Sequence, residues 1–404
     1  MEKKEKGSGL TKNTKLLGLN SFFTDVSTEM IVPLIPIFVT QTLGASALIL
    51  GLIEGWASVS VSIMDLLSGW YSDKIKKRKR LVLLGYSLSA AMKPLLSIAA
   101  TWPQFFVFRF VERMGKGIRR SPRDAIIASE EQKAPGKAFG FRKMMDSAGA
   151  ILGPLITALL LLVLGQSIPA NELYRFIFLL AVIPAAIGVL LILLVKEKKE
   201  ELAKISSKAK LISKDFSHFI LVAAFFSIAQ MGMAFFILRG TEILSLLMVA
   251  VAYTAYNATY TVCAMPAGIL TDALGPKRML TFAYFLFALI CMLFAFASGA
   301  FFILVLFGML GAFMAVMETT PRVYMVKTAP GHKYASAIGT YQGITGLLLL
   351  PANLIAGVLW GLDIGGAPVP FLFSAAIATL AAIALLLFVK DPEQKRNKEQ
   401  AASS

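Results

Sequence analysis

Cysteine, histidine and charge are all scarce in this chain of 404 residues. It has 2 cysteines and 2 histidines, and charged residues make up 16% of the sequence. Cys263 and Cys291 both fall in apolar stretches, so nothing indicates a disulfide framework. His218 and His332 are far apart, and no His/Cys cluster has the spacing of metal ligands. We therefore expect no metal site.

The sequence also lacks the parts of an ATP-driven pump or an enzyme. It contains no G-x-x-x-x-G-K-[ST] loop, and no polar segment is long enough for a nucleotide-binding domain. No pairing of a nucleophile with a base is evident either. We expect no enzymatic activity and no cofactor.

Long apolar runs take up most of the chain, and 57% of its residues are hydrophobic. A membrane-spanning helix needs about 20 mostly apolar residues. The sequence predicts twelve such stretches, at 14–41, 45–72, 80–100, 103–127, 138–163, 173–195, 215–238, 243–271, 278–297, 300–325, 334–361 and 369–390. The predicted fold class is therefore an all-α membrane protein, with the lipid bilayer as its surroundings. The first stretch carries Asp25 and Glu29, which is not typical of a cleavable signal peptide.

The net charge of +16 is distributed as membrane topology requires. Most of the 40 Lys and Arg fall in the N-terminus, the C-terminus and the loops on one side of the predicted membrane. This positive-inside pattern predicts that both termini are cytoplasmic, in the cytoplasmic membrane. It also argues against a nucleic-acid partner.

An internal repeat divides the chain in two. Gly69, three residues and Asp73 precede a basic turn, and Gly268, three residues and Asp272 repeat this pattern 199 residues later. At the same offset, Ser121-Pro122-Arg123 matches Thr320-Pro321-Arg322. A polar segment rich in Lys and Glu lies between the halves. We predict two pseudo-symmetric six-helix bundles, at 1–195 and 216–404, joined by a cytoplasmic linker at 196–215.

The repeated loop resembles the signature of the major facilitator superfamily of secondary transporters. In that family it reads roughly G-x-x-x-D-(R/K)-x-G-R-(R/K). The first copy is matched by Gly69, Asp73, Lys74 and Arg78, with Lys77 in place of the usual glycine. The second copy is matched by Gly268, Asp272, Gly275, Lys277 and Arg278. The resemblance implies two bundles that alternate access to a central cavity, and a loop that latches them on the cytoplasmic side. The alternative is that the basic run only anchors the loop inside.

Two further motifs resemble this family. The segment from Arg109 to Gly115 is similar to the helix-4 pattern R-F-x-x-G-x-G, with Arg113 at the first glycine. Gly149, Gly153 and Pro154 match the first half of the exporter-associated helix-5 pattern G-x-x-x-G-P, but its final glycines are absent. Small residues here would let helix 5 pack closely.

Charges within the predicted spans are the main candidates for function. Asp25 and Glu29 are four residues apart and so share a helix face. The fourth stretch carries a cationic stripe that includes Arg109 and Arg113, with Glu112 beside it. The resemblance implies that helices 1, 4, 7 and 10 line the cavity. Neighbouring carboxylates cannot cheaply hold two charges, so the first-helix pair is a candidate proton site. The alternative is a static ion-pair network. Secondary candidates are Glu54, Asp65, Lys93, Arg142 and Asp146.

The second half has fewer charges, and its candidate residues are mostly aromatic or uncharged polar side chains. Its weak candidates for a substrate cavity are Gln230, Phe235, Tyr341 and Gln342, which could equally be ordinary helix packing. The repeat register also places Arg119 and Glu318 at equivalent positions with opposite charge. We predict that these two close the cytoplasmic mouth as a salt bridge.

Two functions remain open. One is proton-coupled export of a small amphipathic compound, with the proton as coupling ion and Asp25 and Glu29 as its site. The other is a carrier of an organic or phosphorylated anion that the helix-4 arginines hold. In either case we expect a small-molecule substrate and a functional monomer.

Overall fold

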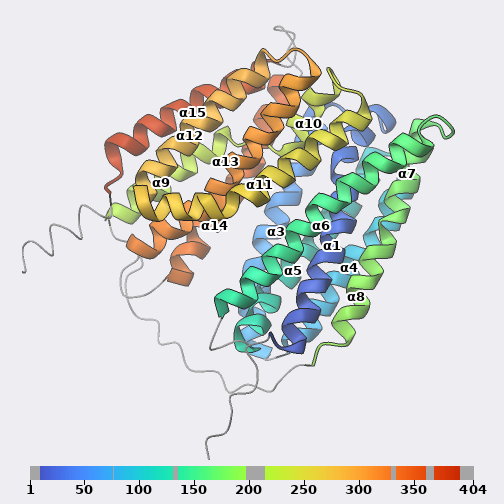
Figure 1. The fold of residues 1–404 in the computed structure, drawn as a ribbon, viewed down its shortest axis with the longest axis horizontal. Helices are drawn as coiled ribbons and strands as arrows, with labels where there is room; N and C mark the ends of the chain where they lie inside the picture. Colours follow the sequence, from blue (N-terminus) through green and yellow to red (C-terminus); the bar gives the residue numbers. More distant parts are fainter. Residues whose placement is uncertain are drawn as a thin grey trace, which may run out of the picture. The chain divides into compact units, whose positions relative to one another are not determined.

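The structure is a computed structural model. It describes residues 10–75, 77–130, 135–196, 214–328, 334–360 and 368–391, and within these ranges it is α-helical almost throughout and has no strand. The predicted all-α class is therefore confirmed. The longer helices are labelled in Figure 1.

The first series of helices accounts for six predicted spans. Its members are α1 (Lys12–Ile31), η1 (Val32–Leu34), α2 (Ile35–Ile37), η2 (Phe38–Thr42), α3 (Ala47–Ile75), α4 (Arg78–Ile98), α5 (Trp102–Glu130), α6 (Pro135–Leu164), α7 (Ala170–Leu180) and α8 (Val182–Leu193). The first span runs through α1, η1, α2 and η2, and the sixth consists of α7 and α8.

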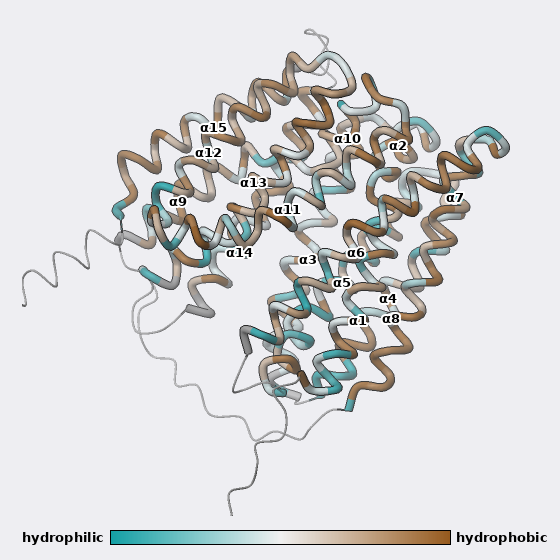
Figure 2. Tube along the Cα trace, viewed as in Figure 1, coloured by the Kyte–Doolittle hydropathy of each residue, from teal (hydrophilic) through white to brown (hydrophobic). Residues whose placement is uncertain are grey.

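The second series follows the same plan. Its members are α9 (Lys214–Ala229), α10 (Met233–Thr241), α11 (Leu246–Leu274), α12 (Pro276–Ala295), α13 (Ala300–Thr328), α14 (Tyr334–Trp360) and α15 (Pro368–Phe388). Here α9 and α10 together form one span. Figure 2 shows that α15 is apolar over most of its length.

Within the described residues, 11 helices are long and apolar enough to cross a membrane. The expected twelfth, α5, is a continuous helix of 29 residues, but it carries too many charged residues to meet that criterion. The hydropathy pattern thus singles out α5 as a helix whose charges must face protein or water rather than lipid.

The chain divides into two compact units. The first contains Met1–Leu34 and Ile63–Ala203, and the second contains Ile35–Ser62 and Lys204–Ser404. Most of the predicted linker at 196–215 lies outside the described residues. Residues 35–62, which the sequence prediction assigns to the first bundle, are grouped with the second unit, because the first half of α3 packs on α14. A Cβ atom at Gly55 would lie 2.7 Å from Leu350 Cδ1.

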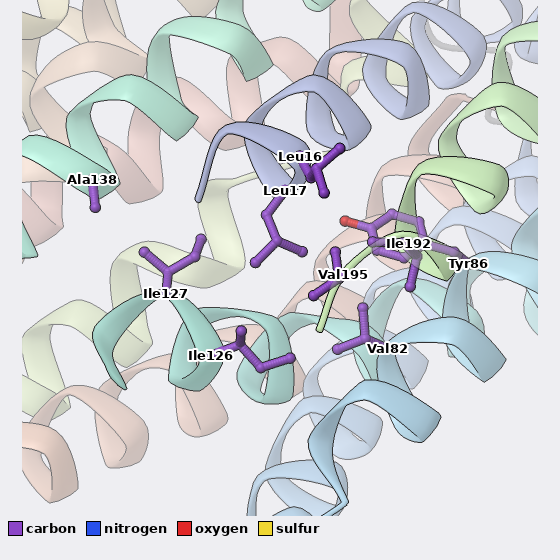
Figure 3. Close-up of a cluster of buried hydrophobic side chains, with 9 residues drawn as sticks. All are labelled: Leu16, Leu17, Val82, Tyr86, Ile126, Ile127, Ala138, Ile192 and Val195. Carbon is purple, nitrogen blue, oxygen red and sulfur yellow. The ribbon is translucent and has the colours of Figure 1, made fainter. Parts of the chain in front are cut away.

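In the first unit, α1 packs on α6 and α8, and α4 packs on α5. One core cluster gathers where α1, α4 and α6 begin and where α5 and α8 end (Figure 3). It consists of Leu16, Leu17, Val82, Tyr86, Ile126, Ile127, Ala138, Ile192 and Val195. This cluster fixes the end of the unit that the charge pattern predicts to be cytoplasmic.

The second unit has an aromatic core. The ring centroids of Phe226 and Tyr284 are 3.6 Å apart in a parallel stack. Between α9 and α10 the helix is interrupted, and the N–H of Gly232 there donates to Asn353 Oδ1 of α14 at 2.9 Å. Asn353 is buried. A buried side-chain amide therefore satisfies the backbone at the break.

Candidate transport site

The acidic segment of α1 packs directly on α6. Asp25 and Glu29 are one turn apart and partly buried. A Cβ atom at Gly149 would overlap the carbonyl oxygen of Phe22 and lie 3.1 Å from Asp25 Cβ. At Gly153 it would lie 2.9 Å from Glu29 Cβ. The two glycines therefore let α6 approach α1 at the turn that carries both acids.

Side-chain hydrogen bonds fix the position of α1. Thr157 Oγ1 of α6 donates to the carbonyl of Met30 at 2.7 Å. On the other side, Asn20 Nδ2 donates to the carbonyl of Gly188 at 2.7 Å. Ser27 donates to the carbonyl of Ala181. These bonds tie α1 to two neighbours, so the acids sit on a rigid helix rather than a mobile segment.

Charges of both signs surround Asp25. Its carboxyl interacts electrostatically with Asp146 and Lys116, and more weakly with Glu29 and Arg123. Asp146 accepts from Arg142 Nη1 at 2.8 Å. The segment is thus a polar patch drawn from α1, α5 and α6, in which the acids lie near a lysine and arginines that attract them.

The predicted cationic stripe of α5 divides into two kinds of residue. Arg109 Nη1 lies 2.9 Å from Glu112 Oε2, and both side chains are buried. Arg113 and Lys116 are only partly buried. Lys93 of α4 is buried nearby, and its Nζ has no hydrogen-bond partner among the described atoms. Glu112 is therefore paired with Arg109, and Lys93 and Arg113, which also interact with it electrostatically, are both cationic.

Arg119 is held where α4 and α5 come closest. A Cβ atom at Gly85 would lie 2.6 Å from the carbonyl oxygen of Gly115, so the backbones nearly touch. Arg119 is buried, donates to Ser89 Oγ at 2.6 Å and lies 4.4 Å from the centroid of the Tyr86 ring. These partners anchor the guanidinium within the first unit.

Its repeat-related counterpart has partners in the second unit. Glu318 of α13 accepts a hydrogen bond from the hydroxyl of Tyr260 in α11. Its other oxygen lies 3.6 Å from Arg322 Nη2. The predicted salt bridge between Arg119 and Glu318 stays a prediction, and each residue has interactions of its own that such a bridge must exchange.

The predicted latch is described only in part. Gly69 packs near Ser121, with a Cβ atom there 3.3 Å from Ser121 Cβ, and Arg78 begins α4. The side chain of Asp73 lies outside the described residues. In the second copy Asp272 and Arg278 are exposed, and a Cβ at Gly268 would meet nothing within 4 Å. The latch stays a prediction.

A structural role for Asp65 emerges beside this loop. Asp65 Oδ1 accepts from the backbone N–H of Ser121 at 3.0 Å and from its hydroxyl at 2.6 Å. Arg120 Nε lies 3.9 Å from the other oxygen. Pro122 follows and has no N–H. Asp65 therefore accepts hydrogen bonds from the interior of α5, next to a proline, and does so from a neighbouring helix. The Ser-Pro pair is the only sequence signal for this role.

The aromatic candidates differ in burial. Gln230, Tyr341 and Gln342 are partly buried. Phe235 is fully buried, and its ring centroid is 5.7 Å from that of Trp360. In this structure Phe235 is thus part of the helix packing.

Comparison with known proteins identifies the family. The model of the Major Facilitator Superfamily matches residues 17–244 and 220–403, which together cover nearly the whole chain. The chain belongs to the Major Facilitator Superfamily. It is 35% identical over 390 residues to an uncharacterized MFS-type transporter of Methanocaldococcus jannaschii, covering 94% of this chain and 95% of that one.

Two solved structures of transporters share the fold of this superfamily member. The nucleoside transporter NupG matches with a TM-score of 0.78 at 14% identity, over 94% of this chain and 100% of that one. The D-xylose-proton symporter matches with a TM-score of 0.75 at 14% identity, over 94% and 98%. The predicted family and fold are therefore confirmed. The protein is a multi-pass membrane transporter of the superfamily, a secondary transporter that works by alternating access.

Proposed function

We propose that this superfamily member exports a small amphipathic compound in exchange for protons. The observation that carries the proposal is the position of Asp25 and Glu29. Both lie on a helix fixed by its neighbours, at the turn where Gly149 and Gly153 bring α6 closest. Ionisable groups inside a membrane protein are expensive to keep, so they mark ion pathways more often than packing.

The arrangement supports proton exchange at this pair. Two carboxylates one turn apart repel each other when both are charged, and the oppositely charged Lys116 and Arg123 interact with Asp25. A site balanced in this way takes up or releases a proton when its surroundings change. Substrate binding and the change of access would supply that change.

The direction of transport rests on the α6 motif. The pattern of Gly149, Gly153 and Pro154 resembles the exporter-associated pattern of the superfamily, and the two glycines lie against the acids. Contact between this motif and the acids supports export. The protein needs no cofactor under this proposal, and we expect it to act as a monomer.

An anion carrier is the second candidate. It is favoured by the partly buried Arg113 and Lys116, of which Lys116 interacts electrostatically with Asp25 and Glu29. Arg109 is less suited to the task, because its side chain is buried and paired with Glu112.

Internal pH in proteoliposomes tests the proposal. A pH dye would be sealed inside, and lipophilic cations or organic anions added outside. We expect a cation to trigger proton movement, and Asp25→Asn or Glu29→Gln to abolish it. Glu172→Gln is the matched control, because Glu172 is an exposed acid of the same unit. Movement triggered only by anions, or retained in both variants, would favour the anion carrier.

A further inference from the structure

A row of tyrosines follows one face of α11. Tyr253, Tyr256 and Tyr260 are spaced three and four residues apart, so they share that face. Tyr253 is buried and stacks on Tyr256, with ring centroids 5.5 Å apart. Tyr256 and Tyr260 are partly buried. The row thus begins in the core and ends in two aromatic rings with accessible surface.

A carboxylate lies at the accessible end of this row. Glu318 of α13 accepts from the hydroxyl of Tyr260, and 33% of its side chain is exposed. Among the acids whose side chains the structure describes in the second unit, Glu242, Asp272 and Asp391 lie at or near helix ends. Glu54 and Glu318, by contrast, lie inside spanning helices. Keeping a charged carboxylate inside a membrane span costs free energy, so such a residue is a candidate functional group.

The two helices form a rigid platform under these side chains. A Cβ atom at Gly311 of α13 would overlap the carbonyl oxygen of Tyr256, so the backbones are in contact. Further along, the hydroxyls of Thr271 and Thr320 are 2.8 Å apart and buried. Tyr256, Tyr260 and Glu318 are therefore held in place before any ligand arrives, which lowers the entropic cost of binding.

We propose that Tyr256, Tyr260 and Glu318 form a subsite for an organic cation. Aromatic faces beside a carboxylate attract a weakly hydrated cation through the ring quadrupole and through charge. A metal ion is a poorer fit, since no group of three His, Cys, Asp or Glu side chains occurs among the residues that the structure describes. This subsite rests on the proposed function, because it specifies that the exported amphipathic compound is a cation.

Arg322 is a cation of the protein itself that would compete with a ligand cation for Glu318. Its Nη2 lies 3.6 Å from Glu318 Oε1, longer than a hydrogen bond, and 46% of the side chain is exposed. A ligand cation can replace this contact, because the ion pair is long and both side chains are partly exposed.

Equilibrium binding of tetraphenylphosphonium to the purified full-length protein tests the subsite. We expect Glu318→Gln to weaken binding by roughly tenfold or more. Glu242→Gln is the matched control, because Glu242 is an acid of the same unit that pairs with Arg239 at the end of α10. Triphenylphosphine oxide has a similar shape but is neutral, so it should compete only weakly with tetraphenylphosphonium for binding to the parent protein. Equal affinities in the two variants, or equal preference for the neutral compound, would overturn the subsite.

A second pair of variants guards against a folding defect in Glu318→Gln. Tyr260→Phe keeps the ring and should retain affinity within about threefold, whereas Tyr260→Leu should lose roughly tenfold. Equal affinity in these two would contradict a role for the ring.

The subsite and the proposed coupling fail in different ways. Phosphonium binding that depends on Glu318, without proton movement in liposomes, leaves the subsite standing and overturns proton-coupled export. Proton movement with unchanged phosphonium affinity in Glu318→Gln overturns the subsite alone.

Discussion

Gly153 of α6 lies directly against Glu29 of α1. A Cβ atom added at Gly153 would be 2.9 Å from the Cβ of Glu29 and 2.8 Å from the carbonyl oxygen of Val26. Gly153, which belongs to the exporter-associated pattern, and Glu29, a candidate coupling acid, therefore pack against each other. In most of this contact the opposing atoms belong to backbone, which cannot move aside as a flexible side chain can.

Gly153→Ala should destabilise the protein and reduce transport. The added methyl must push α1 and α6 apart, and overpacking of this kind costs about 1–3 kcal/mol. Gly140→Ala is the matched control in the same helix, since a Cβ there would meet nothing within 4 Å. Alanine favours helix over glycine, so the control should be as stable as the parent or slightly more so. Thermal unfolding in detergent measures both, and equal midpoints would contradict the packing contact.

Glu112→Gln should be strongly destabilising. It removes the partner of buried Arg109 in a cluster that also contains buried Lys93 and Arg119. Breaking a buried pair by removing one member costs about 3–5 kcal/mol. The double variant Arg109→Met with Glu112→Leu removes both charges and should recover most of the loss. If the double variant unfolds as easily as Glu112→Gln, the ion pair does not explain the effect.

Asp65→Ala should loosen α5 at its proline. The variant leaves the N–H and hydroxyl of Ser121 without their carboxylate acceptor, and loss of a hydrogen bond to a charged group costs about 1.5–3 kcal/mol. Asp65→Asn keeps an acceptor oxygen and should lose less. Ser129→Ala serves as the control, because among the described residues the Ser129 hydroxyl bonds to the carbonyl of Ile126 in its own helix. Unfolding midpoints that rank Asn below Ala would contradict the role of these hydrogen bonds.

Most of the helical frame could be predicted from the sequence, because each span is a long apolar run. The stretch at 103–127 also forms a helix, α5, as expected, although its charges make it less apolar than the other spans. The interruption between α9 and α10 was not predicted, since Asn353, the residue that satisfies Gly232, lies on a distant helix.

The candidate site was predictable only where it depends on one helix. The shared face of Asp25 and Glu29 follows from their spacing. Their contact with α6 does not, because no local pattern says which helix packs against them. The repeat register related Arg119 to Glu318, but could not give their neighbours. Arg119 bonds to Ser89 and Glu318 to Tyr260, and these partners come from tertiary packing.

The most direct test compares exchange with proton-driven accumulation of the same labelled compound. Methyl viologen is the first choice of compound, because this doubly charged organic cation crosses a lipid bilayer poorly, whereas tetraphenylphosphonium diffuses through liposomes without a carrier. Exchange of labelled for unlabelled compound at equal pH needs the change of access but no net proton transfer. Accumulation against a gradient, driven by a pH difference, needs both. We expect the double variant Asp25→Asn with Glu29→Gln to retain exchange and lose accumulation. If the double variant still accumulates the compound in response to pH, the acids of α1 are not the coupling site.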